Sequence, residues 1–119
     1  MVEECIFCKI AKGEVDSKKI YENKNFFSIP DAAPQIKGHG IVISKEHFEN
    51  ILGVPNDISP DLLNCVKETA LKLMEQEHAT GFNIIVNTGK VAGQIVSHLH
   101  IHILPRKEGD DYFISLKKR

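Results

Sequence analysis

The chain has 119 residues, 42% of them hydrophobic and 26% charged, which is the size and composition of one ordinary globular domain. The formal net charge of −1 argues against a general nucleic-acid-binding protein, because such proteins present a basic surface. No apolar run approaches the roughly 18–20 residues that cross a bilayer, and residues 1–5 do not resemble a signal peptide. We therefore expect a single domain over residues 1–119 in the cytoplasm, with reduced cysteines and neither membrane nor sequence-specific nucleic acid as partner.

Two cysteines, Cys5 and Cys8, stand at C-x-x-C spacing in a short segment that we expect to be helical as far as Gly13. This spacing is compatible with a redox pair, with half of a zinc site, or with two small buried hydrophobic residues. A thioredoxin-like redox pair belongs to a βαβ context, and no strand pattern precedes Cys5. Redox chemistry is therefore disfavoured, and the other two interpretations remain open.

The next part of the chain predicts strands of an antiparallel sheet. Residues 20–22 and 26–29 are typical of a hairpin around an asparagine-rich turn, and residues 41–43 form a short apolar strand. Asp31 follows the hairpin, where a carboxylate suits either a turn or a ligand hydroxyl. His39 lies between two glycines, so backbone and ligand can approach it closely.

One long amphipathic helix is predicted from Ser59 to about His78. Ser59 is expected as its N-cap, Pro60 as its first residue, and Gly81 as the stop. Residues 82–87 predict a further strand, so the chain is expected to form an α+β domain on an antiparallel sheet of about five strands. The stripe that recurs at spacings of three and four comprises Leu63, Val66, Ala70, Leu73, Met74 and Glu77, with Leu62, Cys65 and Thr69 alongside.

A run of alternating histidines near the C-terminus is the most informative stretch. His98, His100 and His102 alternate with apolar residues, which is the period-two pattern of a half-buried strand. One face of this strand would be aliphatic, and the other would be a row of imidazoles. Three uses are open: a zinc site, covalent catalysis by an imidazole nucleophile, or three structural histidines satisfied by carbonyl groups.

The residues around this row favour phosphorus chemistry. A glycine-containing loop over residues 88–94 leads into the histidines, and free backbone N–H groups there can hold a phosphate beside an imidazole. No H-E-x-x-H motif supports a hydrolytic zinc centre, and neither a P-loop nor a dinucleotide-binding glycine motif occurs. We expect no organic cofactor.

Residues 98–104, His-Leu-His-Ile-His-Ile-Leu, resemble the histidine triad motif of the HIT family. The likeness extends over nearly the whole chain and implies a HIT-like fold with a long helix and a short N-terminal helix. Residues 44–47 resemble the family's Pro-Lys-x-His segment, with Ser44 where proline is common. The other matching segments are residues 5–10, the turn from Asp31 to Pro34, the strand that follows Gly38 and His39, and Asn87, Gly93 and Gln94.

The resemblance implies a nucleotide hydrolase or transferase acting on the α-phosphorus of nucleoside phosphoramidates or dinucleoside polyphosphates. His100 would be the nucleophile and form a nucleotidyl-histidine intermediate, which water converts to a nucleoside monophosphate. His102 and Gln94 would complete the catalytic group. Asp31 would bind the ribose of a purine nucleotide, and Asn87 would lie on the phosphate side. The other implied substrate-binding residues are Phe7, Ile10, Val15, Ile29, Ile41, Gly93 and again Gln94.

The resemblance also implies a structural zinc ion, because some members hold zinc with two N-terminal cysteines and two histidines. In this sequence the set would be Cys5, Cys8, His47 and His98, which is a closed tetrahedral site. Such an ion would tie the N-terminus to the histidine strand. Family members commonly form homodimers in which two sheets join, and the same is expected for this chain.

One position, Ile95, departs from the family pattern. Many members carry Ser or Thr there, with a hydroxyl that donates to the phosphate or the leaving group. Losing a hydrogen bond of roughly 1.5–3 kcal/mol slows a reaction by about one to two powers of ten. The alternative function is therefore a nucleotide-binding or scaffold protein with weak or no turnover.

Overall fold

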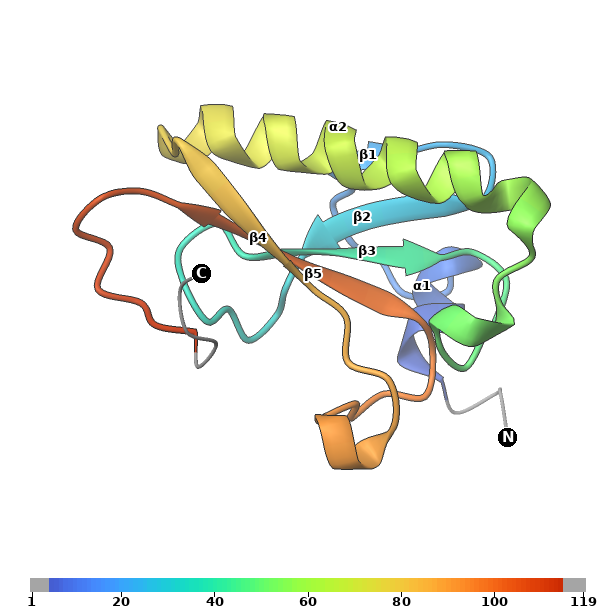
Figure 1. The fold of residues 1–119 in the computed structure, drawn as a ribbon. Coiled ribbons are helices and arrows are strands. Elements are labelled where there is room, and N and C mark those ends of the chain that lie inside the picture. Colours follow the sequence, from blue (N-terminus) through green and yellow to red (C-terminus); the bar gives the residue numbers. More distant parts are fainter. Residues whose placement is uncertain (1–4, 115–119) are drawn as a thin grey trace.

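The computed structural model describes residues 5–114, which form one antiparallel sheet with a helix on each face (Figure 1). The strand order is β1-β2-β3-β5-β4, and every neighbouring pair is antiparallel. The predicted α+β class, with five strands, one long helix and a short N-terminal helix, is confirmed. The helices and strands are α1 (Ile6–Ala11), β1 (Tyr21–Glu22), β2 (Phe26–Pro30), β3 (Gly40–Ser44), α2 (Ser59–Glu77), β4 (Gly81–Ile85) and β5 (His100–Arg106).

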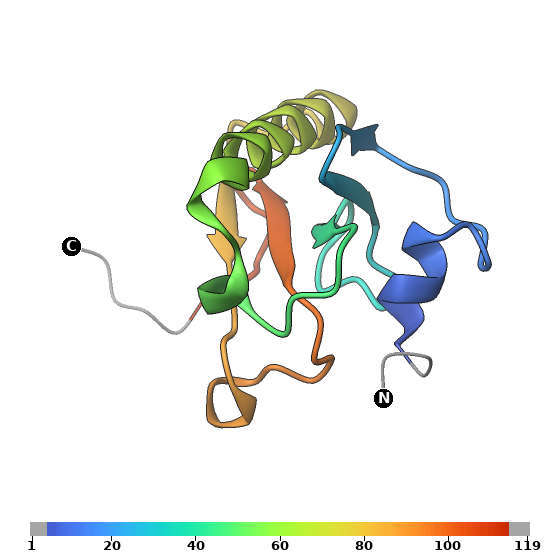
Figure 2. The same ribbon diagram turned by 90° about the vertical axis from the view of Figure 1, so that its right-hand side faces the viewer.

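Helix α2 covers one face of the sheet and makes the larger hydrophobic core with it (Figure 2). Val66, Ala70 and Leu73 on α2 are buried in this cluster together with Ile101 of β5. The expectation that Leu63 belongs to the buried stripe is wrong, because its side chain is 54% exposed. The apolar stripe of α2 is only as wide as the part of the helix that packs on the sheet. Leu63 lies beside this stripe, on the flank of the helix.

The start of α2 differs from the prediction. A 3-10 turn over Asn56–Ile58 runs directly into the helix, and Ser59 already has helical dihedral angles (φ −57°, ψ −35°). An N-cap residue has non-helical dihedral angles, so Ser59 is not the N-cap. Ile58 occupies that position, with no side-chain hydrogen bond to the first turn.

The predicted end of α2 at about His78 is confirmed, but the residue that closes the helix differs from the prediction. His78 is the C-cap in a left-handed conformation with φ 55°, and its N–H donates to carbonyls in the last helical turn. The helix is therefore closed three residues before Gly81, which instead begins β4. Left-handed backbone is less costly for His than for bulky β-branched residues, which allows His78 to take the place usually filled by glycine.

The opposite face of the sheet packs against α1. Phe7 and Ile10 of α1 form a second buried cluster with Ile29 of β2 and with Ile41 and Ile43 of β3. Since successive side chains on a strand alternate, β5 turns its isoleucines toward α2 and its histidines toward the α1 face. This alternation decides which face carries the candidate site.

The histidine row is not wholly part of one strand. β5 begins at His100, whereas His98 precedes it in a segment anchored by the hydrogen bond from Leu99 N to the Phe48 carbonyl, 2.7 Å long. His98 is completely buried, and His100 and His102 are only partly buried. The three imidazoles therefore do not share one environment.

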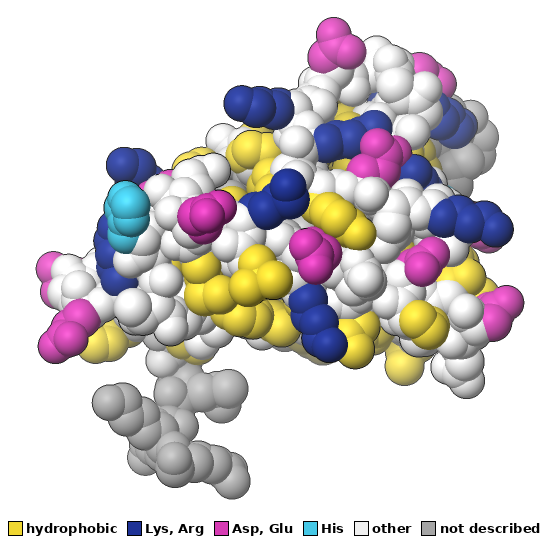
Figure 3. All heavy atoms as spheres, turned by 90° about the horizontal axis from the view of Figure 1, so that it is seen from above, with side chains coloured by type: hydrophobic (Ala, Val, Ile, Leu, Met, Phe, Trp, Pro, Cys, Tyr) yellow, Lys and Arg dark blue, Asp and Glu magenta, His cyan; other side chains and the backbone are white. Residues whose placement is uncertain are grey.

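The outer surface above α2 mixes basic, acidic and hydrophobic side chains without one dominant charge (Figure 3). Leu71 of α2 is 57% exposed on the flank of the helix. Over residues 5–114, no helix combines the length and the apolar character that crossing a membrane would need.

Candidate functional site

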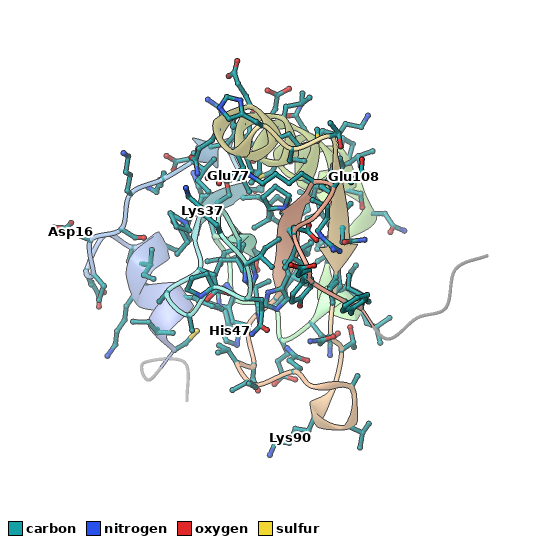
Figure 4. The ribbon with its side chains drawn as sticks, turned by 90° about the vertical axis from the view of Figure 1, so that its left-hand side faces the viewer. Asp16, Lys37, His47, Glu77, Lys90 and Glu108 are labelled. Carbon is teal, nitrogen blue, oxygen red and sulfur yellow. The ribbon has the colours of Figure 1, made fainter. Side chains whose placement is uncertain are left out.

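A cavity of about 790 Å³ opens on the α1 face of the sheet, beside the histidines of β5. Residues of the sheet, α1 and the neighbouring loops line this cavity, and one of them, Asp16, lies at the outer edge of the view in Figure 4. Its size lies within the roughly 300–1,000 Å³ of small-molecule sites. The predicted site residues that line it are Phe7, Ile10, Val15, Ile29, Asp31, Ile41, Asn87, Gly93, His100 and His102.

His100 presents a nucleophilic nitrogen to this cavity. Its Nδ1 lies 2.8 Å from the carbonyl oxygen of His98, so Nδ1 carries the proton and donates it to that carbonyl. In a neutral imidazole the other nitrogen, Nε2, then keeps its lone pair. The ring is flanked by Phe7 and His102, each 5.1 Å away between ring centroids. This environment fixes both the tautomer and the orientation of His100.

His102 has the opposite tautomer, which is fixed by a chain of hydrogen bonds. The backbone N–H of Gln35 donates to Nδ1 of His39, so His39 carries its proton on Nε2. That proton is donated to Nδ1 of His102, 2.9 Å away. His102 must therefore hold its own proton on Nε2, which makes Nε2–H a hydrogen-bond donor for a ligand in the cavity.

Burial keeps His39 and His102 neutral in the free protein. Desolvation, together with the smaller effects of the neighbouring His100 and His39, lowers the pKa of His102 to about 4, although the Asp31 carboxylate acts in the opposite direction. Desolvation also lowers the pKa of His39, although the Asp31 carboxylate acts in the opposite direction. His102 thus provides a hydrogen bond rather than a fixed positive charge.

Asp31 links the end of β2 to this histidine pair. Its Oδ1 accepts a hydrogen bond of 2.8 Å from Ala33 N, and its Oδ2 lies 3.3 Å from Nε2 of His39. Asp31, His39 and His102 have potential ligand atoms within 4.8 Å of one another. Because the His39 proton already bridges to His102, we interpret this group as hydrogen-bonded rather than metal-binding. The carboxylate retains acceptor positions for a ligand hydroxyl.

A second cluster of titratable groups lies behind the histidines and could bind a metal ion. Cys5, Cys8, His47 and His98 each offer one ligand atom, and all four atoms lie within 4.8 Å of one another. Their individual separations include 3.2 Å between Cys5 Sγ and His98 Nδ1, and 3.1 Å between Cys8 Sγ and His47 Nδ1. Ligand atoms around tetrahedral zinc are separated by about 3.3–3.8 Å, so the donor set fits such an ion with little adjustment.

The protonation of this cluster also suits a metal. Nε2 of His98 donates to the Ser44 carbonyl over 2.7 Å, so its Nδ1 lone pair faces the two sulfur atoms. Burial and the neighbouring Cys5 thiol raise the pKa of the Cys8 thiol to about 11. Metal binding would therefore displace a proton from Cys8. The two cysteines and two histidines predicted as ligands are brought together from three separate parts of the chain.

Gln94 takes a position different from the other predicted site residues. Its Oε1 accepts from Gly89 N, and its Nε2 donates to the carbonyls of Glu49 and Val96. These bonds close the loop between β4 and β5, and Gln94 does not line the cavity. Gly93 does line it, with a left-handed backbone (φ +97°) that disfavours any side chain.

His39 and Tyr112 are among the cavity-lining residues to which the sequence-based prediction gave no catalytic or binding role. His39 partners His102, and the only sequence signal for it was its position between two glycines. Tyr112 lines the cavity from the segment that follows β5. No motif marks Tyr112, because its position depends on how that segment folds back.

A sequence profile of the HIT domain matches residues 12–109. The chain belongs to the HIT family. It is 42% identical over 106 residues to an uncharacterized HIT-like protein of Methanocaldococcus jannaschii, covering 89% of this chain and 81% of that protein. It is 37% identical to the adenosine 5'-monophosphoramidase of Candida albicans over 108 residues, covering 87% of this chain and 71% of that protein.

A solved structure extends this comparison to the fold. The Zn-bound histidine triad family protein of Mycobacterium smegmatis is 36% identical and superposes with a TM-score of 0.84, covering 93% of this chain and 81% of that one. The resemblance drawn from the histidine motif is thereby confirmed at the level of family and fold.

Proposed function

We propose that this HIT protein is a nucleotide hydrolase that transfers a nucleotidyl group from a phosphoramidate or dinucleoside polyphosphate to His100 and then to water. One observation carries the proposal: His100 lines the cavity with Nδ1 bonded to the His98 carbonyl, which leaves the Nε2 lone pair free. The name of the Candida albicans relative, adenosine 5'-monophosphoramidase, supports this class of reaction.

In the first step, Nε2 of His100 attacks the α-phosphorus and forms a P–N bond. The bond to the leaving group breaks with its electron pair on the departing atom, which takes a proton from solvent when an amine leaves. In the second step, water attacks phosphorus and loses a proton to solvent, and the electron pair of the P–N bond returns to His100. The Nε2–H of His102 stabilises the charge that develops on the phosphate oxygens.

The rest of the cavity provides the binding groups for a purine nucleotide. We assign the base to the apolar wall formed by Phe7, Ile10 and Ile41, because a planar heterocycle is well matched to aromatic and aliphatic side chains. We assign the ribose hydroxyls to Asp31, as their acceptor, and the phosphate side to Asn87 and Gly93, since all three residues line the cavity. Gln94 then acts indirectly, by holding the loop that carries Gly93.

Incubation with adenosine 5'-phosphoramidate tests the proposal. We expect release of AMP and, during turnover, an intact-mass increase corresponding to one adenylyl group on His100. His100→Ala should show neither, whereas His78→Asn at the exposed end of α2 should behave as wild type. Equal AMP release from wild type and His100→Ala would contradict the assignment of the nucleophile.

A nucleotide-binding protein with weak turnover is the second candidate. It is favoured by Ile95, which lines the cavity and is 92% exposed, and which offers no hydroxyl to the phosphate or the leaving group. If this residue limits the reaction, Ile95→Ser should raise AMP release by about ten-fold or more. An unchanged rate would remove the argument for this candidate.

We further propose that Cys5, Cys8, His47 and His98 hold a structural zinc ion. Four protein ligands leave no open coordination position, so the ion supplies rigidity rather than a reactive water. A cytoplasmic location would keep the two thiols reduced, as zinc binding requires.

We also propose a homodimer in which two sheets join. Strand β4 is an edge of the sheet, and its Phe82 and Ile84 side chains are 37% and 49% exposed. An exposed hydrophobic edge strand favours pairing with another strand. Light scattering should give the mass of two chains for wild type and of one chain for Ile84→Asp.

A further inference from the structure

A second cavity, of about 380 Å³, lies beside the C-terminal end of α2. None of the histidines of β5 lines it, and it shares only Gln35 and Tyr112 with the cavity beside those histidines. The rest of its wall comes from the loop before β3, from the end of α2, and from the end of β5 with the segment that follows. It is therefore a separate feature of the molecule, and the proposed reaction makes no use of it.

Glu77, the last residue of α2, contributes a carboxylate to the wall of this cavity. The residue is only 7% exposed. The loop before β3 makes room for it at Gly38, where a Cβ atom would lie 2.5 Å from Cγ and 3.0 Å from Cδ of Glu77. Gly38 also has a φ of +88°, which residues with a side chain rarely adopt. The Glu77 side chain therefore fits into a recess that depends on this glycine.

No cation of the described chain neutralises this carboxylate. Its Oε2 accepts a hydrogen bond of 2.7 Å from Nε2 of Gln76, which is a neutral amide. Lys107 donates to the backbone carbonyl of Glu77 over 3.0 Å, and within residues 5–114 no ion pair joins the Glu77 side chain to Lys, Arg or His. Burying a carboxylate without a positive partner is costly. The cavity therefore favours a ligand that brings an ammonium group to Glu77.

Two exposed lysines, Lys37 and Lys107, also line the cavity. Lys37 directly precedes Gly38 in the chain, and Figure 4 shows it just below Glu77. A ligand with positive charge alone would be repelled by these lysines, whereas a ligand that also has an anionic group would be attracted to them. The preferred ligand therefore carries both charges.

The two aspartates of the wall agree with this preference. Asp110 accepts hydrogen bonds of 2.7 and 2.9 Å from Arg106, so its charge is already neutralised. Asp111 is exposed and, together with Glu77, balances the charge of the two lysines. A wall with equal and separated charges suits a ligand that is itself neutral overall.

The remaining wall limits the size of the ligand and includes apolar residues. Tyr112 is held there, since its N–H donates to Asp110 over 3.2 Å and its ring centre lies 5.1 Å from the guanidinium carbon of Arg106. A volume of about 380 Å³ is near the lower limit of the roughly 300–1,000 Å³ of small-molecule sites. This space suits a molecule of amino-acid size better than a nucleotide. The apolar residues are Ile36, Ala79 and Pro105.

We propose that the second cavity binds a small zwitterion with an apolar body, of the size and charge of a free aliphatic or aromatic amino acid. Its ammonium group binds the Glu77 carboxylate, and its carboxylate binds Lys37 at the rim. The apolar body lies against Pro105 and Tyr112. This binding is independent of the proposed reaction at His100.

NMR titration of the full chain with L-leucine and L-phenylalanine tests the proposal. We expect saturable shifts of the Gly38 and Ala79 amide signals, with a Kd of about 1 mM or below. The amine 3-methylbutylamine lacks the carboxylate of leucine, and 4-methylpentanoate lacks its ammonium group, so each should bind at least about ten-fold more weakly. No saturable binding of either amino acid, or an amine that binds as tightly as leucine, would overturn the proposal.

Variants locate the binding in the second cavity. Glu77→Gln keeps the size of the side chain and should raise the Kd for leucine at least about ten-fold. Glu75→Gln is its matched control, because Glu75 is exposed near the same end of α2 and does not line the cavity. Lys37→Glu changes an exposed residue and should also weaken binding about ten-fold, whereas Lys72→Glu on the exposed side of α2 should not. Unchanged leucine binding in Lys37→Glu or in folded Glu77→Gln would overturn the assignment.

Two further variants separate this site from the rest of the chain. His100→Ala should bind leucine as wild type does, so loss of AMP release and loss of leucine binding are independent results. Lys117, Lys118 and Arg119 lie outside the described residues, and the variant with all three replaced by Ala should bind leucine with an unchanged Kd. Loss of leucine binding in either variant would overturn the proposed site.

Discussion

His98 and His100 are two residues apart, yet they belong to two different sites. The His98 side chain is fully buried with two thiols and a second imidazole, and its Nδ1 lone pair faces the sulfur atoms. The His100 side chain lines an open cavity, and its Nε2 lone pair is free. In each case the nitrogen that faces the site is set by the partner of the other nitrogen, which is a backbone carbonyl.

The comparison shows how one short stretch connects the two sites. The backbone carbonyl that fixes the His100 tautomer belongs to His98, and Phe7 contacts both rings, with centroids 5.8 Å from His98 and 5.1 Å from His100. Helix α1 likewise carries the metal-ligand candidate Cys8 directly after the cavity residue Phe7, and the second cysteine, Cys5, is its N-cap. Substitutions in the cysteine and histidine cluster should therefore have effects that can be distinguished from those of substitutions in the cavity.

The largest expected effect comes from removing the nucleophile on the cavity side. His100→Ala should lower kcat for AMP release by at least about a thousand-fold, because it removes the nitrogen that forms the proposed covalent intermediate. Its metal content should equal that of wild type, since His100 is not in the cysteine cluster. Loss of the metal together with the activity in His100→Ala would contradict the conclusion that the two sites are separate.

Removal of the proposed zinc ion should affect mainly the buried cluster of cysteines and histidines. We expect about one zinc ion per chain in protein purified without added metal, and none in the double variant Cys5→Ser, Cys8→Ser. The free energy of unfolding should fall by about 3–4 kcal/mol, because the ion binds only the folded state. Cys65→Ala is the control for the metal content, since Cys65 lies on the buried side of α2 in the core and is not in the cysteine and histidine cluster. Elemental analysis and urea unfolding provide both measurements.

Acid should destabilise the protein through His102. The pKa of His102 is about 4 when folded against 6.5 ordinarily, so the unfolded chain binds more protons between these values. Stability is therefore fully present above about pH 6.5 and is lost as the pH falls toward 4, by roughly 3 kcal/mol from this group. Urea unfolding at several pH values should show a shallower loss for His102→Gln than for wild type. Identical slopes for the two proteins would contradict the assignment.

His39 should act through His102 and not through contact with the phosphate. In His39→Phe the donor to His102 Nδ1 is lost, and we expect kcat to fall about ten-fold with a smaller change in KM. His39→Gln keeps an N–H donor and should recover part of the loss. Nitrogen NMR of the His102 side chain provides the decisive readout, because the Nε2–H tautomer should weaken in His39→Phe and persist in His39→Gln.

The smallest expected effect is at Phe7, on the boundary between the two sites. Phe7→Leu preserves the hydrophobic contact with the sheet but removes the aromatic edge against both rings. A loss of about 1 kcal/mol should raise the Kd for AMP about five-fold, measured by calorimetry, with the metal retained. An altered metal content would show that Phe7 supports the buried side as well.

Much of the architecture was predictable because it follows from local patterns. The period-two alternation of residues 99–103 places histidines and aliphatic residues on opposite faces, and the structure has this arrangement. The periodicity of α2 likewise predicts a long helix of the observed type. Its bounds were also predicted, but its capping residues were not, since Ser59 already lies inside a helical turn and His78 closes the helix before the glycine.

Other features depended on contacts between distant residues. Gln94 is four residues from His98, yet its side chain bonds to the loop backbone and to Glu49 rather than lining the cavity. Tyr112 enters the cavity wall only because Arg106 and Asp110 turn the chain back. Neither outcome has a signature within a short window of sequence, since both need partners that folding supplies.

The sequence by itself determined the fold class, the family and the identity of the chemical groups: two thiols, alternating imidazoles and a carboxylate at the end of a strand. The tertiary structure decided which nitrogen of each imidazole faces its site and which histidines have a lowered pKa. Protonation and tautomer depend on burial and on hydrogen-bond partners such as Gln35 N, Ser44 O and His98 O. Identical side chains in one short row consequently acquire different chemistry.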